Sequence, residues 1–79
     1  MAHADFQSLR DYLSGRRRLY DLTQDAVASA AGVSRQTIVS WESGKTAPSI
    51  AQTRAWIAAL PLNDEELAAV ARLVVGGAA

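Results

Sequence analysis

The segment that decides the fold of this chain is LTQDAVASAAGVSRQTIVSWESGK, residues 22–45. Thr23 is a good N-cap for a helix, because its hydroxyl can accept a hydrogen bond from a free amide of the first turn. Gly32 is expected to end that helix, since glycine readily takes the left-handed conformation that follows a helix. Ser34 and Gly44 repeat the same start and stop signals. The segment therefore predicts two short helices joined by a tight turn, the arrangement of a helix-turn-helix unit.

Helices are also predicted on both sides of this unit. Apolar residues recur at helical spacing over residues 5–19, although Gly15 is a point at which that helix could bend or end early. A serine followed three residues later by a glutamine starts a fourth helix over about residues 49–59. Asn63 and Glu66 are expected to cap each other's amides in the same reciprocal way, and with three acidic residues they start a fifth helix over about residues 64–75. The pair Gly76-Gly77 is expected to end it. No segment has the alternation of a strand, so the predicted fold class is all-α with five helices.

Composition limits the chain to one small domain, predicted to span residues 1–79 with its helix-turn-helix unit at about residues 23–43. The chain has no Cys and a single His, His3, so we expect no disulfide, no metal and no cofactor. Its longest apolar stretches are far shorter than the roughly 18 residues that a membrane span needs. The N-terminus also lacks the apolar region of a signal peptide. We therefore expect a cytoplasmic protein with no membrane association. A binding domain is expected and not an enzyme, because an enzyme with a deep pocket would need a longer chain.

The charge of the chain is balanced overall but not along its length. Eight basic and eight acidic side chains give no net charge. Residues 10–45 contain six positive and four negative side chains, whereas the remaining residues carry a net charge of −2. Domains that bind nucleic acid are often basic as a whole. Binding to nucleic acid would therefore depend on a local basic patch in the middle of this chain.

The second helix of the unit has two different faces. Ile38 and Trp41 fall on an apolar face, which is expected to meet Val27 of the preceding helix. The opposite face carries Arg35, Gln36, Val39, Ser40 and Ser43. Arg pairs with guanine O6 and N7 in the major groove of DNA, Gln pairs with adenine N6 and N7, and an apolar side chain can contact the thymine methyl. The alternative is an ordinary solvated helix face, with Val39 as a scattered surface apolar residue.

These residues together resemble the Cro/repressor-type helix-turn-helix family, also called the XRE family. The resemblance covers about Leu9 to Leu60, and its joint pattern consists of Thr23-Gln24, Ala28, Gly32-Val33-Ser34, Ile38, Glu42-x-Gly44-Lys45 and Pro48. It implies a five-helix, lambda-repressor-like domain in which the helix from Arg35 lies in the major groove. It also implies that Gln24 contacts a phosphate and supports that helix. Members of the family commonly bind palindromic operators as dimers.

Two features depart from the pattern of the family. The family often has a glycine immediately before the position of Leu22, where this chain has Asp21. The run of three arginines at residues 16–18 is unusually charged for the end of the first helix. The family often pairs an arginine late in this helix with the glutamate of the third helix, which here implies a structural salt bridge between Arg17 and Glu42.

The candidate site residues fall into three groups. Base readout is assigned to Arg35, Gln36, Ser40 and Val39. Phosphate contacts are assigned to Gln24, Thr23, Ser34, Thr37, Lys45, Arg16, Arg18 and Arg10, because helix N-termini and basic side chains attract phosphate. Structural roles are assigned to Arg17, Glu42, Gly32 and Ala28, of which Ala28 is small where two helices cross closely. For Lys45 and the arginine run, the alternative is solvated surface charge.

The sequence thus predicts a regulator of transcription that binds double-stranded DNA, not an enzyme. A small bacterial or phage-encoded, nucleoid-associated repressor of the Cro-like kind fits the size of the chain. The alternatives are an antitoxin-type regulator and a protein-interaction module of the same fold that ignores DNA. Part of the fifth helix, with residues 60–62, could form a two-fold homodimer interface, the alternative being further core packing. The apolar stripe of that helix consists of Leu67, Val70, Ala71 and Val74.

Overall fold

The computed structural model describes the backbone of residues 5–78 and the side chains of residues 7–74. Within that range the chain forms five helices and no strand, so the predicted fold class is confirmed. The helices are α1 (Asp5–Leu19), α2 (Gln24–Ala31), α3 (Arg35–Ser43), α4 (Ile50–Ala58) and α5 (Asp64–Ala78). The first helix has the predicted bounds and runs through Gly15 without a break. His3 lies outside the described residues.

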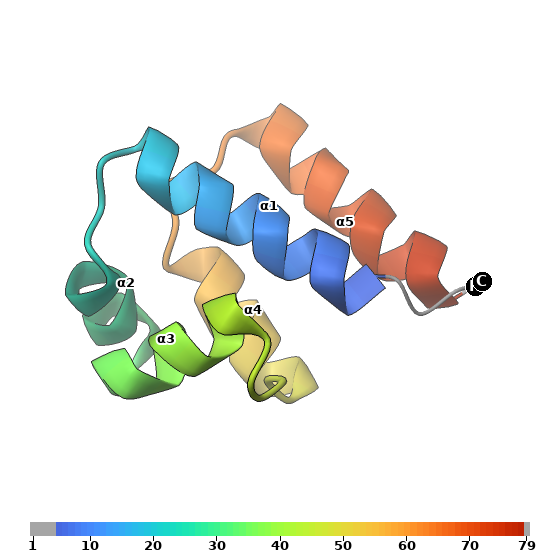
Figure 1. Cartoon of the computed structure of the whole chain (residues 1–79). Coiled ribbons are helices and arrows are strands. Elements are labelled where there is room, and N and C mark those ends of the chain that lie inside the picture. The colour runs from blue at the N-terminus through green and yellow to red at the C-terminus, as the bar shows by residue number, and fades with distance from the viewer. Residues whose placement is uncertain (1–4, 79) are drawn as a thin grey trace.

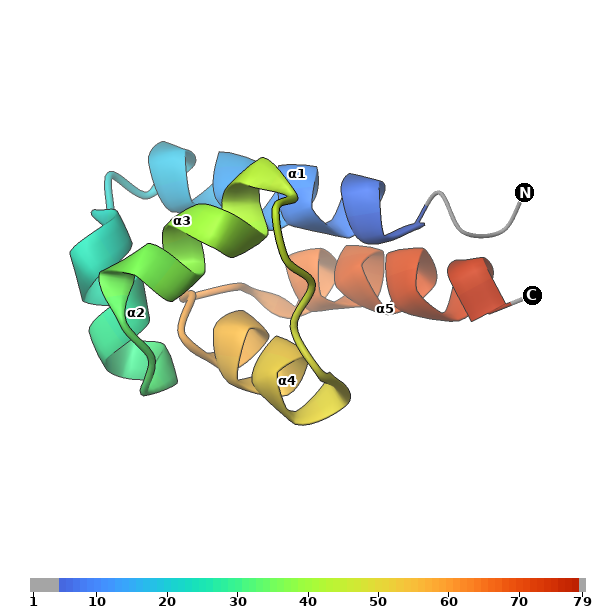
Figure 2. The same cartoon turned by 60° about the horizontal axis from the view of Figure 1, so that its bottom comes forward.

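The five helices form two groups that share one core (Figures 1 and 2). α1 and α5 run antiparallel and pack side by side along most of their length. α2 packs against both α3 and α4, and α3 also contacts α1. In Figure 2, α3 crosses in front of α1, and the loop that follows it descends to α4. One group is thus the antiparallel pair of α1 and α5, and the other consists of α2, α3 and α4. The two groups meet where α3 packs against α1.

One hydrophobic core joins these elements. Its members, each at most 6% exposed, are Leu9, Leu13, Val27, Ala28, Ile38, Trp41, Trp56, Leu60 and Val70. The rings of Trp41 and Trp56 lie with their centroids 5.3 Å apart and their planes tilted by 37°, within the range that aromatic pairs favour. Leu60 belongs to this core, so its side chain is not available to the dimer interface expected over residues 60–62.

The ends of α2 and α3 follow from local chemistry. Thr23 and Ser34 are the N-caps, and each hydroxyl accepts a hydrogen bond from the amide three residues further on. Gly32 and Gly44 close the two helices with φ values of 75° and 82°, which a residue with a Cβ rarely adopts. The predicted capping box is present at the start of α4. The helix-turn-helix unit therefore has the start and stop residues expected from the sequence.

The predicted end of the fifth helix is wrong. α5 continues through Gly76 and Gly77 to Ala78. Each glycine costs a helix about 1 kcal/mol relative to alanine, but it ends the helix only where its backbone turns left-handed. Among the described glycines, positive φ occurs only at the two that close α2 and α3. A glycine pair thus permits a helix to end without requiring it.

Asp21 stands where the family that this chain resembles often has glycine, and the backbone conformation at this position explains why glycine suits it. Its φ is 59°, and its amide donates a hydrogen bond to the carbonyl of Arg18 at 3.0 Å. The left-handed conformation costs most residues roughly 1–2 kcal/mol, although Asp tolerates it better. Asp21→Gly is therefore expected to raise the free energy of unfolding by about 0.5–1 kcal/mol, as measured by urea denaturation.

The matched control for this substitution is Asp25→Gly. It removes the same side chain from the first turn of α2, where the backbone is helical. We expect it to lower the free energy of unfolding by about 0.5–1 kcal/mol, because glycine is a poorer helix former and the acidic side chain in the first turn of α2 is lost. If Asp21→Gly also lowered the free energy of unfolding, the left-handed backbone at Asp21 would not be a source of strain.

A polar cluster ties α5 to α1. The side chain of Glu66 is 9% exposed and accepts hydrogen bonds from the Tyr20 hydroxyl, from Arg16 Nη1 at 3.0 Å and from the Asn63 amide at 2.9 Å. The Asn63 side chain in turn accepts from the Glu66 amide at 2.8 Å, which is the reciprocal cap expected from the sequence. Arg16 also lies over the ring of Tyr12, 5.1 Å from its centroid. The guanidinium of Arg16 is thus engaged between the two helices.

Acid is expected to weaken this cluster. The hydrogen bonds from Tyr20, the Asn63 amide and Arg16 lower the pKa of Glu66, and they outweigh burial, which raises it. Because the pKa is lower in the folded state, the carboxylate contributes stability above its ordinary pKa. This contribution is lost as the pH falls through about 4.5 towards the folded-state value.

The measurement is thermal unfolding followed by circular dichroism between about pH 5 and pH 3. We expect the Tm of the unchanged chain to fall more steeply over this range than that of Glu66→Gln, which cannot ionise. Glu65→Gln, an exposed neighbour on α5, should keep the steep dependence. Equal slopes for all three proteins would exclude Glu66 as the source.

Candidate nucleic-acid interface

α2, the turn and α3 form one packed unit. Val27 and Ala28 of α2 and Ile38 and Trp41 of α3 are all buried, at 1%, 3%, 0% and 2% exposure. The amide of Val33 in the turn donates to the carbonyl of Ala28 at 3.0 Å. The apolar face of α3 therefore packs in the core, and the opposite face points outward.

The outward face of α3 brings together the side chains expected to read bases. Arg35 and Gln36 in its first turn are exposed, and the Arg35 side chain is 58% exposed. Val39 and Ser40, one turn further on, are half-buried. The face thus offers a guanidinium, an amide and a hydroxyl within two turns, together with one apolar side chain.

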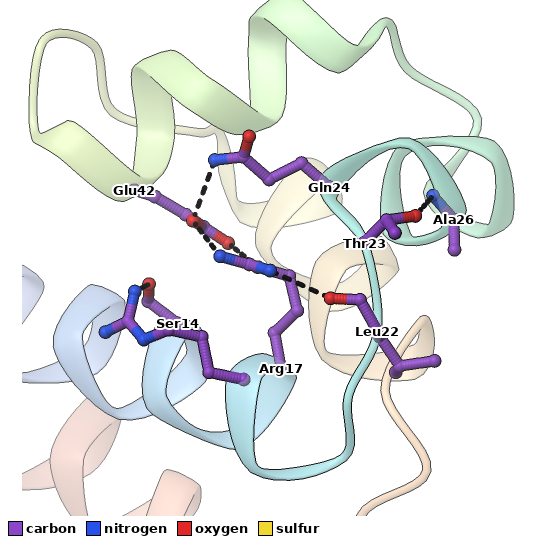
Figure 3. A network of polar contacts seen from close by, with 8 residues as sticks. Ser14, Arg17, Leu22, Thr23, Gln24, Ala26 and Glu42 are labelled. Carbon is purple, nitrogen blue, oxygen red and sulfur yellow. Dashed lines mark hydrogen bonds and ion pairs between the residues drawn. The ribbon is translucent and has the colours of Figure 1, made fainter.

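A largely buried ion pair fixes α3 to the rest of the domain (Figure 3). Arg17 of α1 donates from Nε to Glu42 Oε2 at 2.7 Å and from Nη2 to Glu42 Oε1 at 3.1 Å. Their side chains are 13% and 8% exposed. Arg17 Nη1 donates to the carbonyl of Leu22 at 2.8 Å, and Gln24 Nε2 donates to Glu42 Oε1 at 3.1 Å. α1 and α2 therefore converge on one carboxylate of α3, and Arg17 also contacts the segment before α2.

The candidate phosphate ligands on the unit lie at or near helix ends. Thr23 and Ser34 are exposed caps, and the hydroxyls of Ser34 and Thr37 lie 2.9 Å apart. Lys45 follows α3, and its side chain is exposed while its amide donates to the Ser40 carbonyl at 2.9 Å. The side-chain amide of Gln24 has two N–H groups, and the structure shows one hydrogen bond from it, to Glu42.

The three other arginines expected to contact phosphate lie in different surroundings. Arg18 is exposed and donates to the Ser14 hydroxyl at 3.1 Å. Arg10 lies against the backbone at the end of α3, since a Cβ built on Gly44 would be 2.5 Å from its Nη1. The three side chains thus have different surroundings, and Arg16 is engaged with Glu66 between α1 and α5.

One side chain beside the base-reading face was not singled out from the sequence. Asp25 of α2 forms an ion pair with Arg35, with 4.0 Å between Asp25 Oδ1 and Arg35 Nε. From the sequence, Asp25 is only an acidic residue that favours the N-terminus of α2. The contact of Asp25 with Arg35 depends on the angle between α2 and α3, for which the sequence contains no local signal.

The described residues offer neither a metal site nor a membrane span. Within residues 5–78, no group of three or more His, Asp or Glu side chains is placed to hold a metal ion. No helix in the same part of the chain is long and apolar enough to cross a membrane.

Comparison with known proteins identifies the family. The model of a family described as "Helix-turn-helix" matches residues 13–67, which is more than half of the chain and includes all of α2, α3 and α4. The chain belongs to the XRE-type helix-turn-helix family. The resemblance inferred from the joint pattern of residues is therefore confirmed.

A relative of this helix-turn-helix chain is found in Methanocaldococcus jannaschii. It is described as an uncharacterized HTH-type transcriptional regulator and is 45% identical over 42 residues. The matched region is 53% of this chain and 64% of the relative, so it spans less than two thirds of the length of that protein. No solved structure gives a significant match to the chain.

Proposed function

We propose that this helix-turn-helix domain binds double-stranded DNA at specific sequences and regulates transcription. Membership of the family supports this proposal, as does the description of the relative as an HTH-type transcriptional regulator. The single observation that carries it is the outward face of α3, which presents the exposed Arg35 and Gln36 and is held by the largely buried Arg17–Glu42 pair.

In the proposed complex, α3 enters the major groove and its first two turns contact base edges. Arg35 donates two hydrogen bonds to guanine, Gln36 contacts adenine, Ser40 contacts a base and Val39 meets a thymine methyl. The exposed N-termini of α2 and α3 offer amides to phosphates, because a helix N-terminus is an anion site. The second N–H of the Gln24 side chain and the ammonium of Lys45 add phosphate contacts, which position the domain without reading sequence.

Repression is the mode of regulation that we propose. It needs only that the domain occupy an operator, as a small Cro-like repressor does. A protein-interaction module of the same fold is the competing function, and the absence of net charge favours it. DNA binding falls steeply with added salt because counterions are released from the duplex, so the two functions differ in a measurable way.

The test of this function is selection of bound sites from a pool of random duplexes, followed by titration of binding against salt. We expect a defined site to be recovered and the logarithm of the binding constant to fall linearly with the logarithm of salt concentration. A two-fold symmetric site with half-sites about 34–36 Å apart would indicate binding as a dimer. Recovery of no preferred sequence in dilute buffer would refute the function.

We also propose that the palindromic operator is bound by a homodimer formed through α5. Leu67 and Val74 on this helix are 43% and 47% exposed, although Val70 between them belongs to the core. Val74 also lines an apolar hollow of about 380 Å³ with Ile50, which is 78% exposed. Apolar side chains gathered in this way often mark an interaction site.

Val74→Asp is accordingly expected to convert the dimer into a monomer, because it places a charge in an apolar interface. Sedimentation equilibrium is the measurement. Ala68→Asp adds the same charge at another exposed position of α5, off the stripe, and should leave the association unchanged. An unchanged chain that stays monomeric well above micromolar concentration would exclude the homodimer.

A further inference from the structure

Asp25 stands beside the arginine proposed to read guanine, although it belongs to the other helix of the unit. Its carboxylate oxygen Oδ1 lies 4.0 Å from Arg35 Nε. The two side chains are 76% and 58% exposed, so neither is buried in the domain. A negative charge is thus placed at the edge of a face that, under the proposed function, approaches a polyanion.

The geometry of this pair affects how Arg35 presents its donors. The atom of Arg35 that forms the pair is Nε, which leaves the two terminal nitrogens to other partners. A guanine offers two acceptors, O6 and N7, and a bidentate contact uses two N–H groups of one guanidinium. A carboxylate that attracts the Nε side therefore favours an orientation in which the terminal nitrogens meet the base.

The charge of Asp25 has a second and opposite effect. Phosphates attract cations and repel anions at any sequence, and this attraction supplies most non-specific affinity. A carboxylate next to Arg35 reduces the attraction of that guanidinium for phosphates on every duplex. It would therefore lower binding to wrong sequences while supporting the contact with the right base pair.

We propose that Asp25 is a positioning residue that raises the sequence specificity of Arg35. This inference rests on the proposed DNA-binding function and adds a residue to its readout. The alternative is a purely structural role, in which the acidic side chain of Asp25 stabilises the N-terminus of α2. That role alone would change the stability of the domain and leave the discrimination between base pairs untouched.

The test compares three substitutions of Asp25 with the unchanged chain. Affinity is measured for the selected duplex, for duplexes changed at single base pairs, and for duplexes of random sequence. The base pair read by Arg35 is the one at which Arg35→Ala loses discrimination. For Asp25→Ala and Asp25→Asn we expect discrimination at that base pair to fall about two- to five-fold, with stronger binding to random duplexes. Asp25→Glu keeps the charge and should retain most of the discrimination.

Three controls separate this effect from a general effect of charge, from effects that do not act through Arg35, and from a loss of fold. Asp11→Asn removes an equivalent exposed charge from α1, away from Arg35, and should leave discrimination unchanged. In the background of Arg35→Ala, removal of the Asp25 carboxylate should have no further effect on discrimination. Thermal unfolding of each variant shows whether the domain remains folded at the temperature of the assay.

The outcomes distinguish this inference from the function on which it rests. Unchanged discrimination in Asp25→Ala would overturn the inference while the DNA-binding function stands. A loss spread equally over all base pairs would also overturn it, because Asp25 would then act on the whole domain. If the unchanged chain itself showed no sequence preference, the proposed function would fall, and the role of Asp25 with it.

Discussion

Glu42→Ala is expected to unfold a large fraction of the isolated domain at room temperature. The substitution leaves the Arg17 guanidinium, whose side chain is 13% exposed, without the carboxylate that it contacts at 2.7 Å. Breaking a buried ion pair from one side costs about 3–5 kcal/mol. A domain of this size rarely has more than about 3–5 kcal/mol of stability from its single core. The loss of helical circular dichroism and the exposure of the tryptophans to water would measure the effect.

Two further variants identify the cause of this loss. Glu65→Ala removes an exposed acidic residue and should change the free energy of unfolding by less than about 0.5 kcal/mol. The double substitution Arg17→Met with Glu42→Leu removes both charges, and apolar replacement of a buried pair is often neutral or stabilising. We expect it to be more stable than Glu42→Ala, although the Leu22 carbonyl loses its donor. A Glu42→Ala protein as stable as the unchanged chain would contradict the assignment.

The same carboxylate links stability to the proposed readout. Glu42 lies in the last turn of α3 and accepts from both Arg17 and Gln24. These contacts come from α1 and from the N-terminus of α2, so they fix the direction of α3 relative to the rest of the unit. A network that holds a base-reading helix in place reduces the cost of ordering it on DNA.

Local chemistry explains why much of the fold was predictable from the sequence. Thr23 and Ser34 cap helices because their hydroxyls reach amides three residues away, and no distant residue is needed for this contact. Gly32 and Gly44 close helices through their own φ values. The prediction for the end of α5 was wrong because Gly76 and Gly77 are compatible both with a helix and with its end. Which of the two occurs depends on more than local preference.

Contacts between distant residues were predictable only in part. The pair of Arg17 and Glu42 was inferred from the resemblance to the family, not from any property of the two residues alone. Glu66 was predicted as part of a helix cap, but its contacts with Tyr20 and Arg16 join residues 46 and 50 positions apart. A positive charge such as that of Arg16 has no unique partner in a sequence, so its contact with Glu66 is not predictable from local pattern. The pairing depends on the packing of α1 against α5, which brings Arg16 and Glu66 together.

Arg35→Ala is expected to remove the discrimination at one base pair of the operator. Arg35 lies in the first turn of α3 with its side chain 58% exposed, and a bidentate contact with guanine needs both of its donors. Loss of such a contact should reduce discrimination at that position by about 1–3 kcal/mol. Affinities for duplexes changed at each position in turn are the measurement. The preference at the remaining positions should persist, because Gln36 and Ser40 are unchanged.

Lys45→Ala is the contrasting variant, since its exposed ammonium follows α3 and reads no base in the proposed complex. It should weaken binding to all duplexes alike and reduce the slope of the salt dependence by about one unit. Arg35→Ala therefore alters the ranking of sequences, whereas Lys45→Ala alters the affinity for all of them. If Arg35→Ala left the ranking intact, α3 would not read bases through its first turn, and the readout would have to be sought elsewhere on the unit.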